Sequence, residues 1–502
     1  MNWQHGYRAE VPYTCGYFRE LAPDWLDLAA LLKGQPSPRP NPGAPFRYLE
    51  LGSGMGLSLC LLACLYPEGE FIGIDFNPDH IAHSQRLSDA LQLRNVRFAE
   101  ADILTLASQP GELSNNHHYV AAHGVATWVQ EPIRQALFEL AAAALQAGGF
   151  FYCSYNTLPG WLHSYPLRQL VMANAHRRGS TPDDLLKSLQ ESVDTLKALL
   201  GPPFQPSPLA TQVPGLRNHL AQLMNHPPEY LIQEYMNDAW DPIPVAQMHD
   251  LAASHKLRYV SSATLSDNLE ELLHDRVRET VLSESDPTIR QTLQDLATNQ
   301  RFRRDLFCRG MTRLTSVELS QQFRQLRVAQ REVTQQKEHV YSTSFGSIHF
   351  KANTCVAIED ALASGSQELG TVQDLHGLQS QELLQAIVFL LEANRIGIDR
   401  GGAGKQAENL CRDVNRSLAT MQSTGRPYWV RAAASIGTAV SFSFAEALIE
   451  SALQTDPEAD PLPALAAGLK RANDPLDGDL APVLQTYLLR RPALQRLGAI
   501  EA

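Results

Sequence analysis

A glycine-rich turn between a short strand and a helix, set in a run of alternating strands and helices, most constrains how this chain can fold. Between Phe46 and Tyr155, short apolar stretches alternate with longer helical segments. We expect strands at 47–51, 71–75, 95–98, 119–122 and 149–154, and helices at 57–65, 78–91 and 131–146. Strands that alternate with helices of about 10–15 residues predict βαβ units and a parallel sheet. A sheet of this kind binds ligands beyond the carboxyl ends of its strands.

The composition narrows the class of protein. With 502 residues, of which 44% are hydrophobic and 19% charged, the chain is expected to be globular and to hold about three domains. Its 42 basic residues are outnumbered by 54 acidic ones, and the net charge of −12 disfavours a nucleic-acid partner. No apolar run approaches the roughly 18 residues that cross a bilayer, and the N-terminus lacks a secretory pattern. The seven cysteines are scattered without a Cys-x-x-Cys pair, so we expect no metal site, no disulfide framework and a cytoplasmic location.

Proline and glycine clusters suggest where the domains meet. Five prolines lie between Gly201 and Gly215, and the helical signal dominates after them. We therefore expect domains at 1–200, 216–335 and 340–502, of which the second is mainly helical. In the third, the pattern of Ser380–Glu392 and the residues after it suggests a helix and then a hairpin, which resembles a winged-helix layout in an α+β domain.

The turn after the first expected strand reads Glu50-Leu51-Gly52-Ser53-Gly54-Met55-Gly56. Alternate glycines let a backbone turn sharply and come close to a ligand, and a helix start offers free N–H groups to an anion. A tight turn without a ligand is the alternative. The dinucleotide fingerprint would need a glycine where Leu57 stands. The carboxylate of Glu50 would repel a pyrophosphate but suits a ligand with an ammonium group, directly or through water.

Two further acidic residues follow the next two expected strands. Asp75 can accept hydrogen bonds from both hydroxyls of a ribose; its alternative role is to cap the following helix, for which Asn77 is better suited. Asp102 can accept a hydrogen bond from an adenine amino group while Ile103 packs on the ring; the alternative is an exposed loop acid. Together with the glycine loop, these positions describe a pocket for a nucleoside that carries a short amino-acid tail.

S-adenosylmethionine is such a ligand, and the motif Glu/Asp-x-Gly-x-Gly-x-Gly resembles that of class I methyltransferases. The resemblance implies a Rossmann-like α/β sheet of seven strands, whose parallel part is completed by a C-terminal antiparallel hairpin. With their neighbours in these motifs, the predicted cofactor-binding residues are Glu50, Gly52, Ser53, Gly54, Gly56, Asp75, Phe76, Asn77, Asp102, Ile103, His123 and Gly124.

Other segments resemble a bacterial family of methyltransferases with a methyltransferase regulatory domain, which includes the rickettsial outer-membrane-protein lysine methyltransferases. These segments are 11–21, 67–78, 122–125 with Trp128, 154–161, 229–231, 235–238 and 299–305. The resemblance implies a catalytic domain, a helical middle region and a C-terminal domain around an open cleft. It also implies methylation of lysine in a protein, and a homodimer.

Methyl transfer is an in-line displacement, so the enzyme must chiefly align the acceptor, the methyl carbon and the sulfur. A lysine amine, with a reference pKa of about 10.4, must lose its proton before it attacks, and desolvation near a positive sulfonium favours that loss. The candidate catalytic residues are Tyr13, His123, Tyr155 and Asn156. The first lies with Tyr17 in an N-terminal segment that closes over the cofactor in the resembled family, and the others follow strands. Trp128 and Trp161 could wall the pocket, although for every aromatic residue core packing is the alternative.

Two polar stretches are expected to carry no chemistry. His117-His118 has the pattern of a solvated loop, and the basic stretch from Arg301 to Lys337 has the pattern of a solvated helix face, although it could contact an acidic partner protein.

The leading hypothesis is a methyltransferase that acts on protein lysine. The alternatives are a methyltransferase for a small molecule and a cofactor-binding scaffold without turnover.

Overall fold

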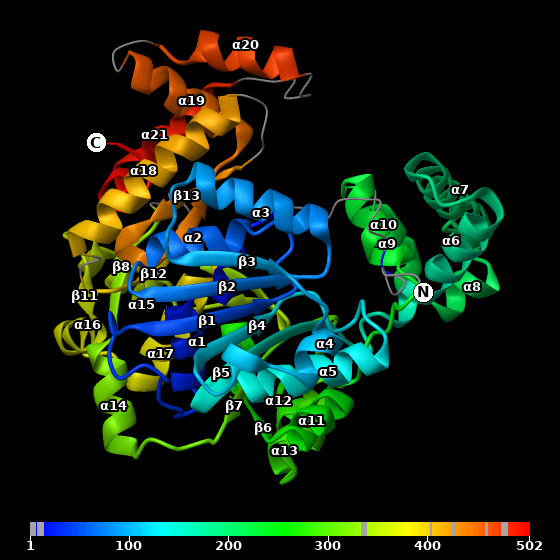
Figure 1. Ribbon diagram of the computed structural model, residues 1–502, viewed down its shortest axis with the longest axis horizontal. Coiled ribbons are helices and arrows are strands. Elements are labelled where there is room, and N and C mark those ends of the chain that lie inside the picture. The colour runs from blue at the N-terminus through cyan, green and yellow to red at the C-terminus, as the bar shows by residue number, and fades with distance from the viewer. Residues whose placement is uncertain are drawn as a thin grey trace.

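A seven-stranded sheet forms the centre of the computed structural model (Figure 1). The structure describes residue 7 and residues 15–223, 225–332, 339–401, 404–423, 428–456, 460–472 and 480–501. The strand order is β3-β2-β1-β4-β5-β7-β6, with β7 antiparallel to both of its neighbours and the other pairs parallel. The bounds are β1 Phe46–Leu51, β2 Gly69–Asp75, β3 Val96–Glu100, β4 His117–Ala122, β5 Leu145–Asn156, β6 Leu257–Ser262 and β7 Phe302–Arg309.

Helices cover both faces of the sheet, which is why its strands carry apolar residues on both sides. In β1, Tyr48 packs into one core with α1, α2 and the C-terminal helices, whereas Leu49 packs into another with α5 and α11. The helices of this part are α1 Pro23–Leu31, α2 Leu57–Leu65, α3 Pro78–Ala90, α4 Ile103–Ser108, α5 Glu131–Ala144, α11 Val245–Ser254, α12 Asp275–Ser283 and α13 Pro287–Thr298. The expected parallel sheet is therefore confirmed, and the three expected helices are present as α2, α3 and α5.

A lobe of helices stands beside the sheet, at the right of Figure 1. It contains α6 Tyr165–Arg178, α7 Pro182–Leu200, α8 Pro208–Gln212, α9 Gly215–Leu223 and α10 Pro228–Met236. The lobe has its own core, in which Leu167, Leu189, Leu220 and Tyr235 are buried.

Strands that precede this lobe in the sequence and strands that follow it belong to the same sheet. Strands β6 and β7 lie inside the range 216–335, for which the sequence predicted mainly helices, yet they pair into the same sheet as β1–β5. The domain limits 1–200, 216–335 and 340–502 stay a prediction. The sheet itself spans the first two of these ranges.

The C-terminal part contains two small antiparallel sheets and a hairpin among helices. Its strands are β8 Arg327–Gln330, β9 Val340–Thr343, β10 Gly346–His349, β11 Gln367–Glu368, β12 Ile396–Asp399, β13 Val430–Ala433 and β14 Thr438–Ser441. Its helices are α14 Ser316–Gln325, α15 Ala352–Leu362, α16 Leu369–His376, α17 Ser380–Glu392, α18 Gly404–Ser423, α19 Phe444–Thr455, α20 Leu462–Ala472 and α21 Ala481–Arg496. The expected helix is α17, but β12 pairs with β8 rather than with a following strand, so the hairpin prediction is wrong and the winged-helix layout is not confirmed.

Buried cysteines lie where the C-terminal part packs against helix α2. Cys60 and Cys64 of α2 are fully buried. The Sγ atom of Cys64 lies 3.0 Å from that of Cys411 in α18, and both are free thiols. The helix that follows the glycine loop therefore packs directly on a C-terminal helix.

Two polar stretches fold differently from what the sequence predicted. His117 begins β4 and is fully buried, so the doublet it forms with His118 is not a solvated loop. Arg303 and Arg304 lie in β7 rather than on a helix face, and Arg303 is 4% exposed. Lys337, at the end of that basic stretch, is outside the described residues. In both cases, strand pairing with distant segments overrode the local polar pattern.

An ionic cluster holds β7 to α13 and β5. The guanidinium of Arg303 donates to Asp305 at 3.0 Å and to Asp295 at 2.5 Å, and the hydroxyl of Tyr155 donates to Asp305 at 2.6 Å. All four side chains are buried. Removing one member of a buried ion pair leaves an uncompensated charge and destabilises a protein strongly.

We therefore predict that Arg303→Ala lowers the free energy of unfolding by about 3–5 kcal/mol, because Asp295 and Asp305 lose their counter-ion. Urea unfolding followed by circular dichroism measures the change. Arg258→Ala is the control, since Arg258 is exposed on the neighbouring strand β6, and it should change stability by less than about 0.5 kcal/mol. Equal effects of the two substitutions would contradict a structural role for the cluster.

Candidate active site

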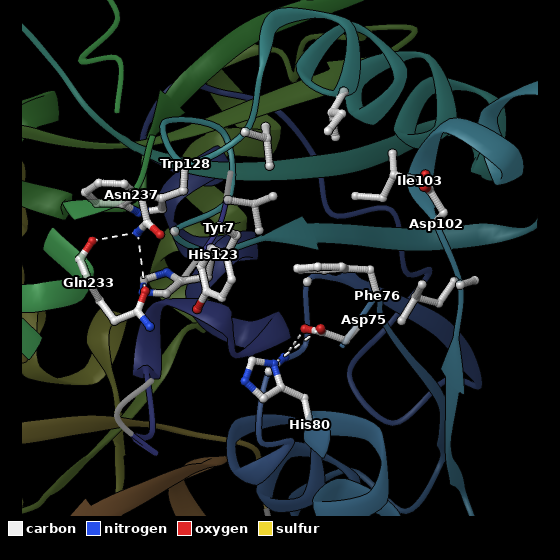
Figure 2. Close-up of a pocket in the computed structure, with 18 residues that line it drawn as sticks. Tyr7, Asp75, Phe76, His80, Asp102, Ile103, His123, Trp128, Gln233 and Asn237 are labelled. Atoms are coloured by element: carbon white, nitrogen blue, oxygen red, sulfur yellow. Dashed lines mark hydrogen bonds and ion pairs between the residues drawn. The ribbon is translucent and has the colours of Figure 1, made fainter. Parts of the chain in front are cut away.

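A cavity opens at the carboxyl ends of β1, β2 and β4, where the strand order reverses between β1 and β4. Such a switch point is where open α/β sheets bind ligands. The cavity is lined by Tyr7, Gly52, Gly54, Ile74, Asp75, Phe76, His80, Ala101, Asp102, Ile103, His123, Gly124, Val125, Trp128, Val129, Ile133, Gln233 and Asn237. Figure 2 shows Phe76, Asp102 and Ile103 toward one end, with Asp75 beside Phe76, and His123, Gln233 and Asn237 toward the other.

The glycine loop borders the cavity through Gly52 and Gly54, both of which have the left-handed backbone that favours glycine. Gly52 has a φ of 77°, and a Cβ atom there would lie 2.5 Å from Val125 Cγ2. Gly54 has a φ of 51°, and a Cβ atom there would meet no atom within 4 Å. The backbone at Gly54 thus faces open space, as the close approach of a ligand requires.

Asp75 joins the loop to the end of β2 and the start of α3. Its Oδ2 accepts a hydrogen bond from the Gly54 amide at 2.8 Å. Its Oδ1 accepts one from the Asn77 amide at 2.9 Å and lies 3.3 Å from His80 Nδ1 (Figure 2). Asn77 caps α3 through its side chain, as expected, and so leaves Asp75 at the cavity wall.

One end of the cavity is mostly apolar. Phe76 and Ile103 line it, and the ring of Tyr7 meets that of Phe76 edge-on with centroids 5.8 Å apart. Asp102 caps α4, where its Oδ1 accepts from the Leu104 amide at 2.7 Å, and it also faces the cavity. Apolar walls with an acid beside them suit an aromatic base.

At the other end, His123 is held by side chains of β5. Its Nδ1 lies 2.9 Å from the Tyr152 hydroxyl and 3.1 Å from Ser154 Oγ, which also accepts from the Gly124 amide at 2.8 Å. The ring of Phe18 packs on the imidazole at 4.0 Å between centroids. Burial, with a contribution from Arg304, lowers the pKa of His123 to about 4, so the imidazole is neutral near pH 7.

Helix α10 closes the same end from the lobe. Gln233 and Asn237 line the cavity, are each 1% exposed, and are joined by a 2.7 Å hydrogen bond from Asn237 Nδ2 to the Gln233 carbonyl. The guanidinium of Arg168 in α6 fixes the turn after α10 by donating to the Asn237 carbonyl at 2.5 Å. Sequence reasoning missed both amides as site residues, although Asn237 lies in a segment that carried the family resemblance.

Six predicted site residues that the structure describes do not line the cavity, namely Glu50, Ser53, Gly56, Asn77, Tyr155 and Asn156. Tyr155 points to Asp305 in the ionic cluster and is fully buried, while Asn156, 5% exposed, ends β5. Ser53 and Gly56 belong to the loop but do not line the cavity. Tyr13 lies outside the described residues.

The other aromatic candidates lie in three different places. Trp128 lines the cavity, and Trp161 lines a second cavity. The Tyr17 hydroxyl lies 2.8 Å from Thr438 Oγ1.

Glu50 is a buried acid directly behind the glycine loop. It is 4% exposed and stands behind the cavity wall rather than on it. Burial, reinforced by the charge of Asp75, raises the pKa of Glu50 to about 8. The carboxyl group is therefore poised to ionise when a positive charge comes near it.

Within the described part of the chain, no group of three His, Cys, Asp or Glu side chains is arranged to hold a metal ion. The helices described there include none that is long and apolar enough to span a membrane.

The sheet order and the acid-ended second strand over a Gly-x-Gly-x-Gly loop define a class I methyltransferase fold. A family model described as "Methyltransferase domain" matches residues 44–192, and one described as "Predicted methyltransferase regulatory domain" matches residues 227–309. A Synechocystis relative, uncharacterized protein sll1526, is 31% identical over 394 residues, which cover 78% of this chain and 76% of the relative. The uncharacterized protein RP789 of Rickettsia prowazekii is 26% identical over 61% of this chain and 53% of its own length.

Among solved structures, PKMT2 from Rickettsia typhi in complex with AdoHcy shares the fold, with a TM-score of 0.67 and 17% identity. The match covers 97% of this chain and 99% of that one. This chain belongs to the family of S-adenosylmethionine-dependent methyltransferases that carry a methyltransferase regulatory domain.

We predict that Glu50→Gln raises the melting temperature of the cofactor-free protein at pH 8.5, and that the gain shrinks toward pH 5. The folded state holds a proton on Glu50 up to about pH 8, whereas an unfolded glutamate loses it near its ordinary pKa of 4.5. Unfolding in this window releases the proton, so the wild type loses stability as the pH rises, and the variant does not. Glu100→Gln, at an exposed position that ends β3, is the control. A gain of equal size at pH 5 and pH 8.5 would contradict titration of Glu50.

Proposed function

We propose that this methyltransferase transfers the methyl group of S-adenosylmethionine to the side-chain amine of lysine in a protein. The observation that carries the proposal is that the whole chain, and not only its cofactor domain, shares its fold with Rickettsia typhi PKMT2. The sequence also resembles a family that includes lysine methyltransferases of outer-membrane proteins. A homodimer, which that resemblance implied, stays a prediction.

The cavity fits the cofactor. Gly54 presents bare backbone to open space, the acidic side chain of Asp75 lies at the wall, and an apolar slot lies beside Phe76 and Ile103. Among the described residues, Glu50 Oε2 is buried without a hydrogen-bond partner, as expected for an acid that awaits a positive group. When bound, S-adenosylmethionine supplies a methyl group on a positively charged sulfur.

The roles of the residues follow from their places. Asp75 would accept hydrogen bonds from the ribose hydroxyls, and Asp102 would accept one from the adenine amino group, while Ile103 packs on the base. The backbone of Gly52 and Gly54 would border the amino-acid tail. Its ammonium group would act on Glu50 from across the loop and draw its pKa down.

We place the lysine amine at the end of the cavity lined by His123, Gln233 and Asn237, which we call the acceptor end. None of these three side chains is charged near pH 7. His123 is neutral near pH 7, so it does not repel an incoming amine, and its ring with Gly124 borders the place where the methyl group is transferred. Gln233 and Asn237 close that end against water. Since desolvation favours the neutral form of an amine, this dry surrounding promotes attack.

Transfer of label tests the proposal. Purified protein and S-adenosylmethionine tritiated on the methyl group are added to a lysate of cells that lack this protein, and labelled bands are examined by mass spectrometry. Methyl-lysine in a protein band is the expected result. Label in small molecules would instead support a small-molecule methyltransferase, and cofactor binding without transfer would support a scaffold; either result overturns the lysine proposal.

We predict that Asp75→Ala weakens binding of S-adenosylmethionine by at least tenfold. The substitution removes charge-assisted hydrogen bonds to the ribose, each worth about 1.5–3 kcal/mol, and releases the Gly54 amide. Titration calorimetry measures the affinity. Asp79→Asn is the control, because Asp79 is exposed in the first turn of α3 and does not line the cavity. Unchanged affinity of a folded Asp75→Ala protein would remove the ribose role from Asp75.

A further inference from the structure

Two carbonyl groups of the glycine loop are held by side chains of helix α3. The Oγ atom of Ser84 donates to the Gly54 carbonyl at 3.1 Å, and Nδ1 of His83 lies 2.8 Å from the Met55 carbonyl. Asp75 acts on the same loop in the opposite sense, because it accepts a hydrogen bond from the Gly54 amide. The loop is therefore fixed by α3 through its carbonyl groups and by the end of β2 through an amide.

The loop and α3 are in direct contact at this place. Gly56 has a φ of 76°, and a Cβ atom there would lie 2.7 Å from the Cβ atom of Ser84. Met55 and His83 are both partly buried, and neither lines the cofactor cavity. Any effect of His83 on the cofactor must therefore pass through the backbone of the loop.

The C-terminal part of the chain supplies the second partner of His83. Nε2 of the imidazole lies 2.9 Å from the hydroxyl oxygen of Tyr428, a residue 345 positions away in the sequence. Tyr428 is 3% exposed and shortly precedes β13, which packs on α2 (Figure 1). Beyond β13, the Gly437 carbonyl accepts a 2.8 Å hydrogen bond from the Tyr66 hydroxyl at the end of α2. These contacts hold Tyr428 in place beside the cofactor domain.

The two contacts define the roles of the ring nitrogens of His83. A carbonyl oxygen can only accept a hydrogen bond, so Nδ1 must carry the proton in the bond to Met55. In the neutral ring, Nε2 then has a lone pair, and the Tyr428 hydroxyl donates to it. The hydroxyl therefore favours the tautomer that binds the loop.

These bonds bear on how the loop meets the amino-acid tail of the cofactor. A carbonyl group that accepts a hydrogen bond from α3 is turned toward that helix. The carboxylate of the tail is attracted by N–H groups at the start of a helix and is repelled by carbonyl oxygens. Holding the carbonyls of Gly54 and Met55 against α3 thus favours the anionic end of the ligand.

We propose that His83 and Tyr428 are positioning residues for S-adenosylmethionine. Through the Tyr428 hydroxyl and the His83 ring, the C-terminal part of the chain holds the glycine loop in the shape that binds the cofactor. Neither residue was predicted as a site residue from the sequence, and neither lines the cavity. The inference concerns the cofactor alone and holds for any methyl acceptor.

Two tyrosine variants test this assignment. Tyr428→Phe removes only the hydroxyl that reaches His83. Tyr487→Phe is the matched control, because Tyr487 is also buried in the C-terminal part and donates its hydroxyl to Glu450 at 2.6 Å. In titration calorimetry, we expect Tyr428→Phe to weaken binding of S-adenosylhomocysteine by about three- to tenfold, the range that one hydrogen bond gives, and Tyr487→Phe to keep the wild-type affinity. Urea unfolding of the cofactor-free proteins should show a loss of stability in both variants, so the affinity alone separates positioning from packing.

Variants of His83 test the route from the tyrosine to the loop. His83→Ala leaves the Met55 carbonyl without its donor and should weaken binding by about tenfold. His83→Asn places an amide N–H close to the position of Nδ1 and should recover most of the affinity. Since neither variant has an Nε2 atom, adding Tyr428→Phe to either one should change the affinity by less than about twofold.

The outcomes decide between positioning and its alternatives. Wild-type affinity in a folded Tyr428→Phe protein, or an equal loss in Tyr487→Phe, would overturn the inference. So would an equal loss from Tyr428→Phe with and without His83, because the tyrosine would then act by another route. If Tyr428→Phe does not fold, equal affinities of His83→Ala and His83→Asn would contradict the role of the donor. Absence of methyl-lysine in the labelling experiment would overturn the proposed function and leave these affinities as they are.

Discussion

The carboxylate of Asp75 is the interaction on which the rest of the cofactor site depends. Through its two oxygens it binds the amide of Gly54 in the loop after β1 and the amide of Asn77 before α3. The glycine loop, the end of β2 and the start of α3 thereby hold one fixed arrangement. Because Gly54 and Gly52 carry no side chain, the arrangement leaves backbone rather than side chains facing the cavity.

Burial sets the charge of the groups around this core. It keeps His123 neutral and, near neutral pH, keeps Glu50 mostly protonated. The imidazole at the cavity wall therefore adds no positive charge near pH 7 to a site that receives a positively charged sulfonium. Glu50, which desolvation keeps mostly protonated, would ionise when the ligand brings a positive charge near it.

The part of the chain that matches the regulatory-domain family model does more than flank the catalytic sheet. Residues 227–309 contain α10, from which Gln233 lines one end of the cavity, and also β6 and β7, which complete the sheet. The buried pairs of Arg303 anchor β7 at the other end of the same segment. One continuous stretch therefore contributes both to the cavity wall and to the sheet.

Local sequence patterns determined the parallel part of the sheet, the glycine loop and the acids at 50, 75 and 102, because each depends on neighbouring residues or on a short βα unit. Only the tertiary structure decided which distant segments join them. Residues 302–309 became a strand because they pair with the edge of β5, and residues 257–262 pair in turn with them. His117 became buried where β4 pairs with β5. Likewise, Gln233 and Asn237 gained their places in the cavity wall from the packing of α10 on α6 in the helical lobe, a contact between residues far apart in sequence that no local periodicity encodes.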